Sequence, residues 1–284
     1  MAIKKTAVIG AGQMGGGIIQ VFAQNGYDTT VWVRSDASAE KAKAKMEKAY
    51  GKMVAKGKMT EEEKAAAIGR ITYVQDYAAL GDVDLVVEAA SENFDLKADI
   101  FRELDKNCKA DCILATNTSS LPITEIAAVT SRPDKVIGMH FMNPVPVMKL
   151  IEIIRGLDTT DEVYAAIEGM SKDIGKVPVE VNDFPGFVLN RVLQLMINEA
   201  IQCVYEGLAE PQAIDEAMKY GANHPMGPLA LADLIGLDTV LAIMNVMYEG
   251  FNDSKYRPSP LLKQYVAAGK LGVKSGAGFY DYSK

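Results

Sequence analysis

Apolar and polar positions follow two different periods along most of the chain, and these periods predict strands and helices in turn. From Lys5 to Val181, short runs rich in β-branched residues alternate with longer stretches whose apolar residues recur at helical spacing. Such an order is typical of βαβ units, so we predict an α/β fold with a mostly parallel, doubly wound sheet. The predicted strands are residues 6–9, 29–33, 71–74, 85–88, 113–116, 136–139, 150–154 and 177–181.

Two further segments complete the predicted organisation. The lysine-rich stretch from Ala42 to Glu63 indicates a helical hairpin beside the sheet, with its turn at residues 56–58. After Asn182 the strand pattern stops, because residues 183–186 form a turn sequence and only helical periods follow. We therefore predict an α/β domain over residues 1–183 and an all-helical domain over residues 184–284. The predicted helices of the second domain are residues 187–205, 210–220, 228–248 and 260–267.

The composition narrows the class of protein. Of 284 residues, 49% are hydrophobic and 24% are charged, as in folded globular proteins. A net charge of -7 argues against a nucleic-acid partner. Amides and charges from Asn190 to Glu199 interrupt the most apolar helix, which argues against a membrane span, and no leader pattern precedes the first strand, so we expect a cytoplasmic protein. The three cysteines lack the spacing of a disulfide framework or a metal site.

The first predicted strand ends in a glycine motif that suits the phosphates of a dinucleotide. The run Gly10-Ala11-Gly12-Gln13-Met14-Gly15 is a G-x-G-x-x-G sequence between a strand and a helix. Its first glycine permits a tight turn, its second lets the backbone approach a pyrophosphate, and its third lets the helix pack on the strand. The helix N-terminus then stabilises the phosphate charge. The motif predicts a Rossmann-like domain with these residues at the cofactor.

The end of the second predicted strand indicates which nicotinamide dinucleotide is bound. Selection of NAD normally uses an Asp or Glu at this point, to bond the ribose 2′-hydroxyl, but Val33 has no carboxylate. Arg34 and Ser35 offer a cation and a hydroxyl that suit a 2′-phosphate. We therefore favour NADP(H) over NAD(H) as the cofactor. The alternative is that Arg34 is a solvated surface residue and that Asp36 performs the acidic role in binding NAD(H).

The chain has only two histidines, which narrows the search for a general acid or base. His140 closes an apolar run and so lies at the carboxyl end of a strand, where open α/β sheets bind ligands. Glu152 lies in the next strand among large apolar residues, and a buried glutamate is costly without a partner. If that strand folds back along the preceding one, Glu152 can bond one imidazole nitrogen and leave the other facing a substrate. A structural ion pair is the alternative, and His224, which has no evident acidic partner, is interpreted as structural.

Long motifs around this pair resemble those of the 3-hydroxyacyl-CoA dehydrogenases, in particular the 3-hydroxybutyryl-CoA type. The resemblance covers essentially the whole chain. It implies reversible hydride transfer between a nicotinamide cofactor and C3 of a short-chain acyl-CoA, acetoacetyl-CoA or 3-hydroxybutyryl-CoA. Val33 departs from the family pattern, which puts NAD preference in doubt and leaves the reaction intact. The matching motifs are residues 115–120, 140–154, 185–191, 223–228 and 274–280.

The resemblance also implies roles for single residues. His140 would be the catalytic base, Glu152 would orient it, and Ser119 and Asn190 would bond the reacting oxygen. Asn143 would help to hold the nicotinamide. The remaining implied contacts are Glu92, Lys97, Asn117, Ser119 and Lys274 for the cofactor, and Lys52 and Lys56 for the CoA phosphates.

Three rival interpretations remain open at this stage. A dehydrogenase of free β-hydroxyacids would share the two-domain plan, but such enzymes are expected to use a lysine base. A non-catalytic dinucleotide-binding protein would be expected to lack the His140–Glu152 pair, Ser119 or Asn190. A domain of a multifunctional oxidation enzyme would need room for a hydratase, so we expect a stand-alone enzyme. Wide apolar faces in the helical domain, including Val188 and Val192, predict a homodimer through that domain.

Overall fold

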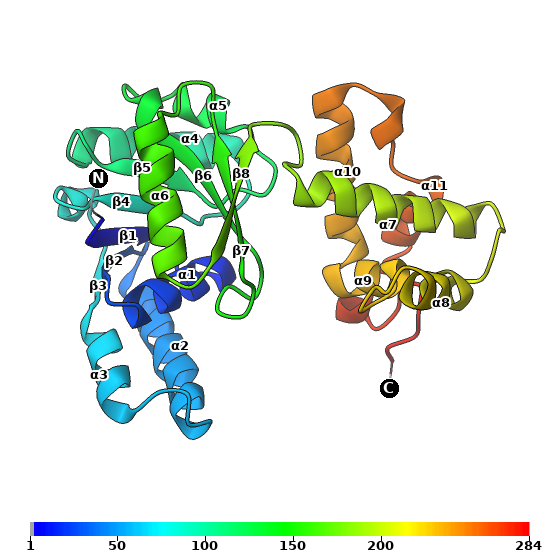
Figure 1. Ribbon diagram of the computed structural model, residues 1–284, viewed down its shortest axis with the longest axis horizontal. Coiled ribbons are helices and arrows are strands. Elements are labelled where there is room, and N and C mark those ends of the chain that lie inside the picture. Colours follow the sequence, from blue (N-terminus) through cyan, green and yellow to red (C-terminus); the bar gives the residue numbers. More distant parts are fainter. Residues whose placement is uncertain (1–2, 284) are drawn as a thin grey trace. The chain divides into compact units, whose positions relative to one another are not determined.

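The computed structural model describes residues 3–283 and divides into two compact units. The first unit extends to Asp183, and the second begins at Phe184. The first holds the sheet and its covering helices, whereas the second contains helices without a paired sheet (Figure 1). The predicted fold class, a doubly wound α/β unit followed by an all-helical unit, is confirmed.

One sheet of eight strands forms the centre of the first unit, in the order β3-β2-β1-β4-β5-β6-β7-β8. All neighbouring strands are parallel except β6 and β7, which are antiparallel. Helices cover both faces, so the central strands are almost entirely buried, including polar residues such as Glu88 and Thr116. The strands are β1 Lys5–Ile9, β2 Asp28–Trp32, β3 Ile71–Val74, β4 Leu85–Glu88, β5 Ile113–Thr116, β6 Val136–Phe141, β7 Leu150–Arg155 and β8 Val177–Asn182.

The helices of the first unit include the predicted hairpin. In this hairpin, α2 ends just before Gly57, which adopts a left-handed φ, and Thr60 caps the start of α3 through a capping box with Glu63. In Figure 1 this hairpin extends beyond the edge of the sheet, while α1 packs against the strands. The helices are α1 Gln13–Gln24, α2 Asp36–Ala55, α3 Glu61–Gly69, α4 Phe94–Asn107, α5 Ile123–Ala127 and α6 Asp161–Asp173.

The second unit corrects one sequence prediction. Residues 228–248 were predicted as one helix, but Gly236 has a φ of 100°, and the two segments around it are bent by 97°. A left-handed φ ends a right-handed helix, and only glycine adopts it without strain. A core that includes Ile201, Leu229 and Met244 joins the helices. They are α7 Leu189–Tyr205, α8 Pro211–Gly221, α9 Pro228–Ile235, α10 Leu237–Phe251 and α11 Pro260–Ala267.

Residues 3–283 include no single helix that is long and apolar enough to cross a bilayer. The bent pair α9 and α10 meets the length and composition criteria only when its two helices are taken together.

Candidate active site

His140 and Glu152 face each other across the single antiparallel strand pair of the sheet. The register of β6 and β7 aligns the two residues, and 2.8 Å separates His140 Nδ1 from Glu152 Oε2. Both side chains are buried, with exposed fractions of 5% and 1%. An ionised carboxylate only accepts hydrogen bonds, so Nδ1 carries a proton and Nε2 is left with its lone pair. The geometry therefore prepares Nε2 to accept a proton from a ligand.

Ser119 lies on the other side of the imidazole. It belongs to the loop after β5, and its Oγ is 3.1 Å from His140 Nε2. The Ser119 hydroxyl therefore lies at hydrogen-bonding distance from the imidazole nitrogen that Glu152 does not contact. The three side chains come from three neighbouring elements at one end of the sheet, and they form a continuous Glu152–His140–Ser119 chain.

The loop that carries Ser119 is held by Glu92. Oε1 of Glu92 accepts from Thr118 Oγ1 at 2.6 Å, from the Ser119 amide at 2.8 Å and from the Ser120 amide at 3.1 Å. Burial raises the pKa of Glu92, but the Lys97 ammonium and these hydrogen bonds outweigh it and leave the pKa below its usual value. Glu92 is therefore an ionised anchor for the Ser119 loop near neutral pH.

Lys97 pairs with two carboxylates in the structure, and its implied contact with the cofactor stays a prediction. Its side chain is 1% exposed, and its ammonium lies 2.7 and 2.8 Å from the two carboxylate oxygens of Glu88. It also lies 3.5 Å from Glu92. A buried cation committed to two carboxylates has little donor capacity left for a cofactor. In this structure the Lys97 ammonium therefore stabilises the Glu92 carboxylate.

Two asparagines that the resemblance assigned to the cofactor have different environments. Asn117 is buried, and its Oδ1 accepts from the Phe141 amide at 2.9 Å, which ties the end of β5 to β6. Asn143 is exposed in the loop after β6, where its Oδ1 accepts from Gln13 Nε2 at 3.1 Å. Gln13 begins α1, so this contact links the loop to the glycine motif.

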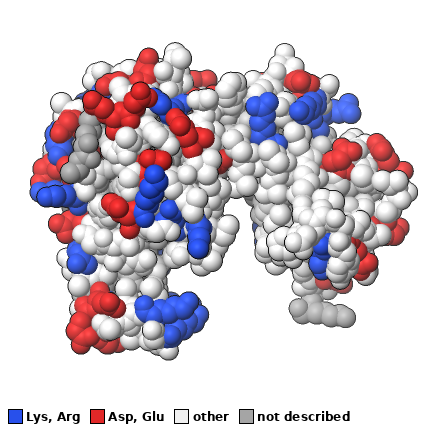
Figure 2. All heavy atoms as spheres, in the orientation of Figure 1, with Lys and Arg blue, Asp and Glu red and all other residues white. Residues whose placement is uncertain are grey.

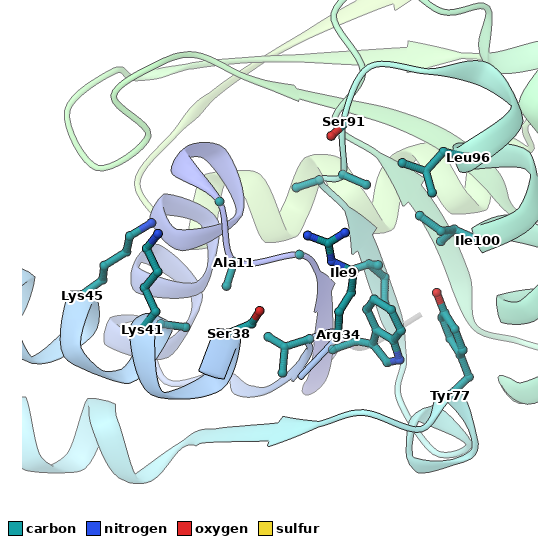
Figure 3. Close-up of a pocket in the computed structure, with 17 residues that line it drawn as sticks. Ile9, Ala11, Arg34, Ser38, Lys41, Lys45, Tyr77, Ser91, Leu96 and Ile100 are labelled. Atoms are coloured by element: carbon teal, nitrogen blue, oxygen red, sulfur yellow. The ribbon is translucent and has the colours of Figure 1, made fainter. Parts of the chain in front are cut away.

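A cavity of about 460 Å³ opens beside the glycine motif (Figure 3). Gly10, at φ 94°, and Gly12 line it, while a side chain at Gly15 would lie 2.0 Å from the carbonyl oxygen of Gly10. Met14 packs against the core. The backbone therefore approaches the cavity closely at the N-terminus of α1, as binding of a pyrophosphate requires. These residues fit a dinucleotide.

The cavity is basic at the end that is lined by α2 and by the residue pair following β2, Val33 and Arg34. Arg34 lines it, and α2 contributes Ser38, Lys41 and Lys45, which share one helical face (Figure 3). Trp32 also lines the cavity, and its ring stacks on that of Tyr77 with the centroids 4.8 Å apart. Lys41 and Lys45 were not among the residues predicted from the sequence, although their spacing from Ser38 is a detectable signal.

Ser35 and Asp36, the other candidates at this strand end, serve the protein itself. The Ser35 hydroxyl caps α2 by accepting from the Ser38 amide at 3.3 Å, and Ser35 is not among the residues that line the cavity. Binding of the cofactor by Ser35 stays a prediction, whereas Ser38 lines the cavity. Asp36 accepts from Gln75 Nε2 at 2.6 Å and does not line the cavity either.

The remaining candidates lie elsewhere. Lys52 and Lys56 are exposed at the end of α2, where Figure 2 shows basic side chains gathered beside the acidic ones of α3. Asn190 is buried in α7 of the second unit, and Lys274 of that unit forms an ion pair with Asp238. Within residues 3–283, no three His, Cys, Asp or Glu side chains are grouped as metal ligands.

The chain matches two family profiles in succession. Residues 5–184 match the NAD-binding domain of 3-hydroxyacyl-CoA dehydrogenase, and residues 186–282 match the C-terminal domain of the same family.

Whole-length relatives agree with these profiles. A probable 3-hydroxybutyryl-CoA dehydrogenase of Bacillus subtilis is 56% identical over 100% of this chain and 99% of its own. The 3-hydroxybutyryl-CoA dehydrogenase of Clostridioides difficile is 53% identical over 99% of this chain and 100% of its own. The crystal structure of (S)-3-hydroxybutyryl-CoA dehydrogenase from Ralstonia eutropha has a TM-score of 0.97 and 51% identity, with 100% of both chains covered.

Proposed function

Because the chain belongs to the 3-hydroxyacyl-CoA dehydrogenase family, we propose that it interconverts acetoacetyl-CoA and (S)-3-hydroxybutyryl-CoA. Its similarity to relatives named for this reaction supports the four-carbon substrate. The observation that carries the proposal is the buried imidazole of His140, whose two nitrogens lie 2.8 Å from a carboxylate and 3.1 Å from a hydroxyl. This arrangement suits the transfer of one proton to or from an alcohol.

His140 acts as the acid and base of the proposed reaction. In oxidation the C3 hydroxyl loses its proton to Nε2, and C3 loses a hydride, which the oxidised nicotinamide accepts when bound. Glu152 holds Nδ1–H and stabilises the imidazolium that results. Ser119 donates to the C3 oxygen, and the family resemblance implies the same role for Asn190. In reduction the imidazolium returns the proton to the oxygen as C3 gains the hydride.

NADP(H) is the favoured cofactor in this proposal. Arg34, Ser38 and Lys41 present two cations and a hydroxyl at the basic end of the cavity, and these suit a 2′-phosphate. Val33 supplies no carboxylate, and the Asp36 carboxylate accepts from Gln75. NAD(H) binding without a ribose-bonding acid is the alternative. Asn143 would hold the nicotinamide end.

The proposal also covers the CoA tail, the assembly and the compartment. Lys52 and Lys56 are exposed cations on one helical face, which suits them to the CoA phosphates. Val188 and Val192 expose 50% and 67% of their surface in the second unit, and such apolar exposure supports a homodimer through that unit. We place the enzyme in the cytoplasm.

Initial rates test the reaction and the cofactor together. Purified protein would be given NADPH or NADH in parallel cuvettes, each with acetoacetyl-CoA or with free acetoacetate. We expect rapid oxidation of NADPH with the thioester only. Faster oxidation of NADH would keep the reaction and overturn the cofactor preference. Turnover of acetoacetate alone would favour a β-hydroxyacid dehydrogenase, and no turnover in any cuvette would contradict the proposal.

A further inference from the structure

A buried cation outside the groups described above lies at the start of β8. Lys176 is 9% exposed, and its ammonium donates to the carbonyl oxygens of Val145 and Met148, the latter at 2.6 Å. Both recorded partners are main-chain carbonyls and neither is a carboxylate. Burial lowers the pKa of Lys176. A buried ammonium is costly, so its presence here calls for a compensating role.

The two carbonyls belong to the loop that joins β6 to β7, residues 142–149. This loop begins just after His140 and carries Asn143. The amides of Val147 and Met148 both donate to the carbonyl of Pro144 at 3.0 Å, which folds the loop into a tight turn. The Lys176 ammonium bridges the carbonyls of Val145 and Met148, which lie on either side of the Val147 amide, and so holds the turn closed.

The same loop meets the glycine-motif helix. Asn143 accepts from Gln13 at 3.1 Å, and a side chain at Gly17 would lie 2.7 Å from Cβ of Val145. The loop therefore packs on α1 through Val145 and bonds to α1 through Asn143. Because the Lys176 ammonium donates to the carbonyl of Val145, it fixes the position of the residue that packs on α1.

We propose that Lys176 is a positioning residue that fixes the 142–149 loop and thereby holds Asn143 at the nicotinamide end of the cofactor. This inference rests on the function proposed above for Asn143. An apolar side chain of similar length would leave the buried carbonyl of Val145 and the partly buried carbonyl of Met148 without this donor, and the turn would rearrange to satisfy them. The rearrangement would displace Asn143 while His140 and Glu152 stay fixed in their strands.

Binding of the reduced cofactor tests the proposal without any acyl-CoA. In a fluorescence titration with NADPH, Lys176→Met should weaken binding by about 10-fold, the effect of leaving buried carbonyls unpaired. The matched control is Lys172→Met, which removes an exposed lysine of α6 paired with Glu168 at 3.0 Å and should leave binding unchanged. In turnover, Lys176→Met should raise the cofactor KM and leave kcat within about 3-fold.

A double-mutant cycle shows whether Lys176 acts through Asn143. Adding Lys176→Met to Asn143→Ala should change cofactor affinity by less than about 2-fold, because the contact is already lost. Multiplicative losses, or normal binding by Lys176→Met, would overturn the proposal. If Lys176→Met does not fold, Lys176→Gln keeps one donor group and should show an intermediate loss; normal binding by it would also count against the role. If the wild-type protein does not turn over acetoacetyl-CoA, the substrate assignment would be overturned instead.

Discussion

Two regions of the first unit are built in opposite ways. We call the region around His140 and Glu152 the chemical end, and the basic part of the cavity around Arg34, Lys41 and Lys45 the adenosine end of the proposed cofactor site. At the chemical end, His140 and Glu152 are buried and joined at 2.8 Å, and each lies within a strand. At the adenosine end, Arg34, Lys41 and Lys45 line an open cavity. In residues 3–283 the structure records no ion pair for these three cations, whereas their neighbour Lys43 pairs with Glu40 at 2.7 Å.

This contrast separates the reaction from the choice of cofactor. A hydrogen-bonded chain within strands is preorganised, so proton transfer needs no rearrangement of the protein. Exposed lysines near a cavity can stabilise the charge of a bound phosphate. Because water solvates them when no phosphate is bound, they cost the folded protein little free energy. Mutations at one end should therefore alter turnover, and mutations at the other should alter cofactor affinity.

The largest expected effect is at His140. His140→Gln removes the base while keeping a polar side chain, and kcat should fall by about 10³-fold or more. The rate of NADPH oxidation with acetoacetyl-CoA measures this. Retention of most of the activity would show that another group carries the proton.

Glu152→Gln should have the next largest effect. It keeps the volume but removes the charge that stabilises the imidazolium, so kcat should fall by about 10²-fold with the substrate KM little changed. Glu180→Gln is the control, because Glu180 is a half-exposed residue of β8 paired with Arg155 at 3.2 Å. Equal losses in the two variants would reduce Glu152 to a structural role.

At the adenosine end, single changes should act on one cofactor only. Arg34→Ala and Lys41→Ala should each raise the KM for NADPH by about 10-fold, since each removes a charge-assisted contact to the 2′-phosphate. The KM for NADH should stay within about 2-fold. Parallel kinetics with both cofactors check this, and an equal rise for both would identify Arg34 as a structural residue.

The smallest effect is expected at Ser35, and it separates helix capping from cofactor binding. Ser35→Ala removes the cap of α2 and should lower the free energy of unfolding by about 1 kcal/mol, with NADPH affinity preserved. Urea denaturation gives the first quantity and fluorescence titration the second. The companion variant Ser38→Ala should mainly weaken NADPH binding. The opposite assignment of the two effects would identify Ser35 as the cofactor contact.

Much of the fold was predictable because strands and helices have different periods. The strands match their apolar runs closely, and the pairing of His140 with Glu152 was predicted on the condition that the second strand folds back along the first, as β7 does along β6. The break at Gly236 was not predictable, since the apolar pattern continues across it and glycine also occurs inside helices.

The site was predictable to a lesser degree, for a physical reason. Sequence identifies which residue types cluster near a strand end, but not which of them the fold uses for itself. Ser35 caps α2, and Lys97 pairs with Glu88. Lys41, which lies one helical turn after Ser38, lines the cavity. Lys176 gave no signal, because its partners are main-chain carbonyls that carry no side-chain pattern.

The separation of the two ends is tested most directly by the dissociation constant of NADPH for His140→Gln and for Arg34→Ala, measured side by side by fluorescence titration. The account predicts a wild-type value for His140→Gln, despite its lost turnover, and binding about 10-fold weaker for Arg34→Ala. Weakened binding in His140→Gln together with normal binding in Arg34→Ala would contradict it.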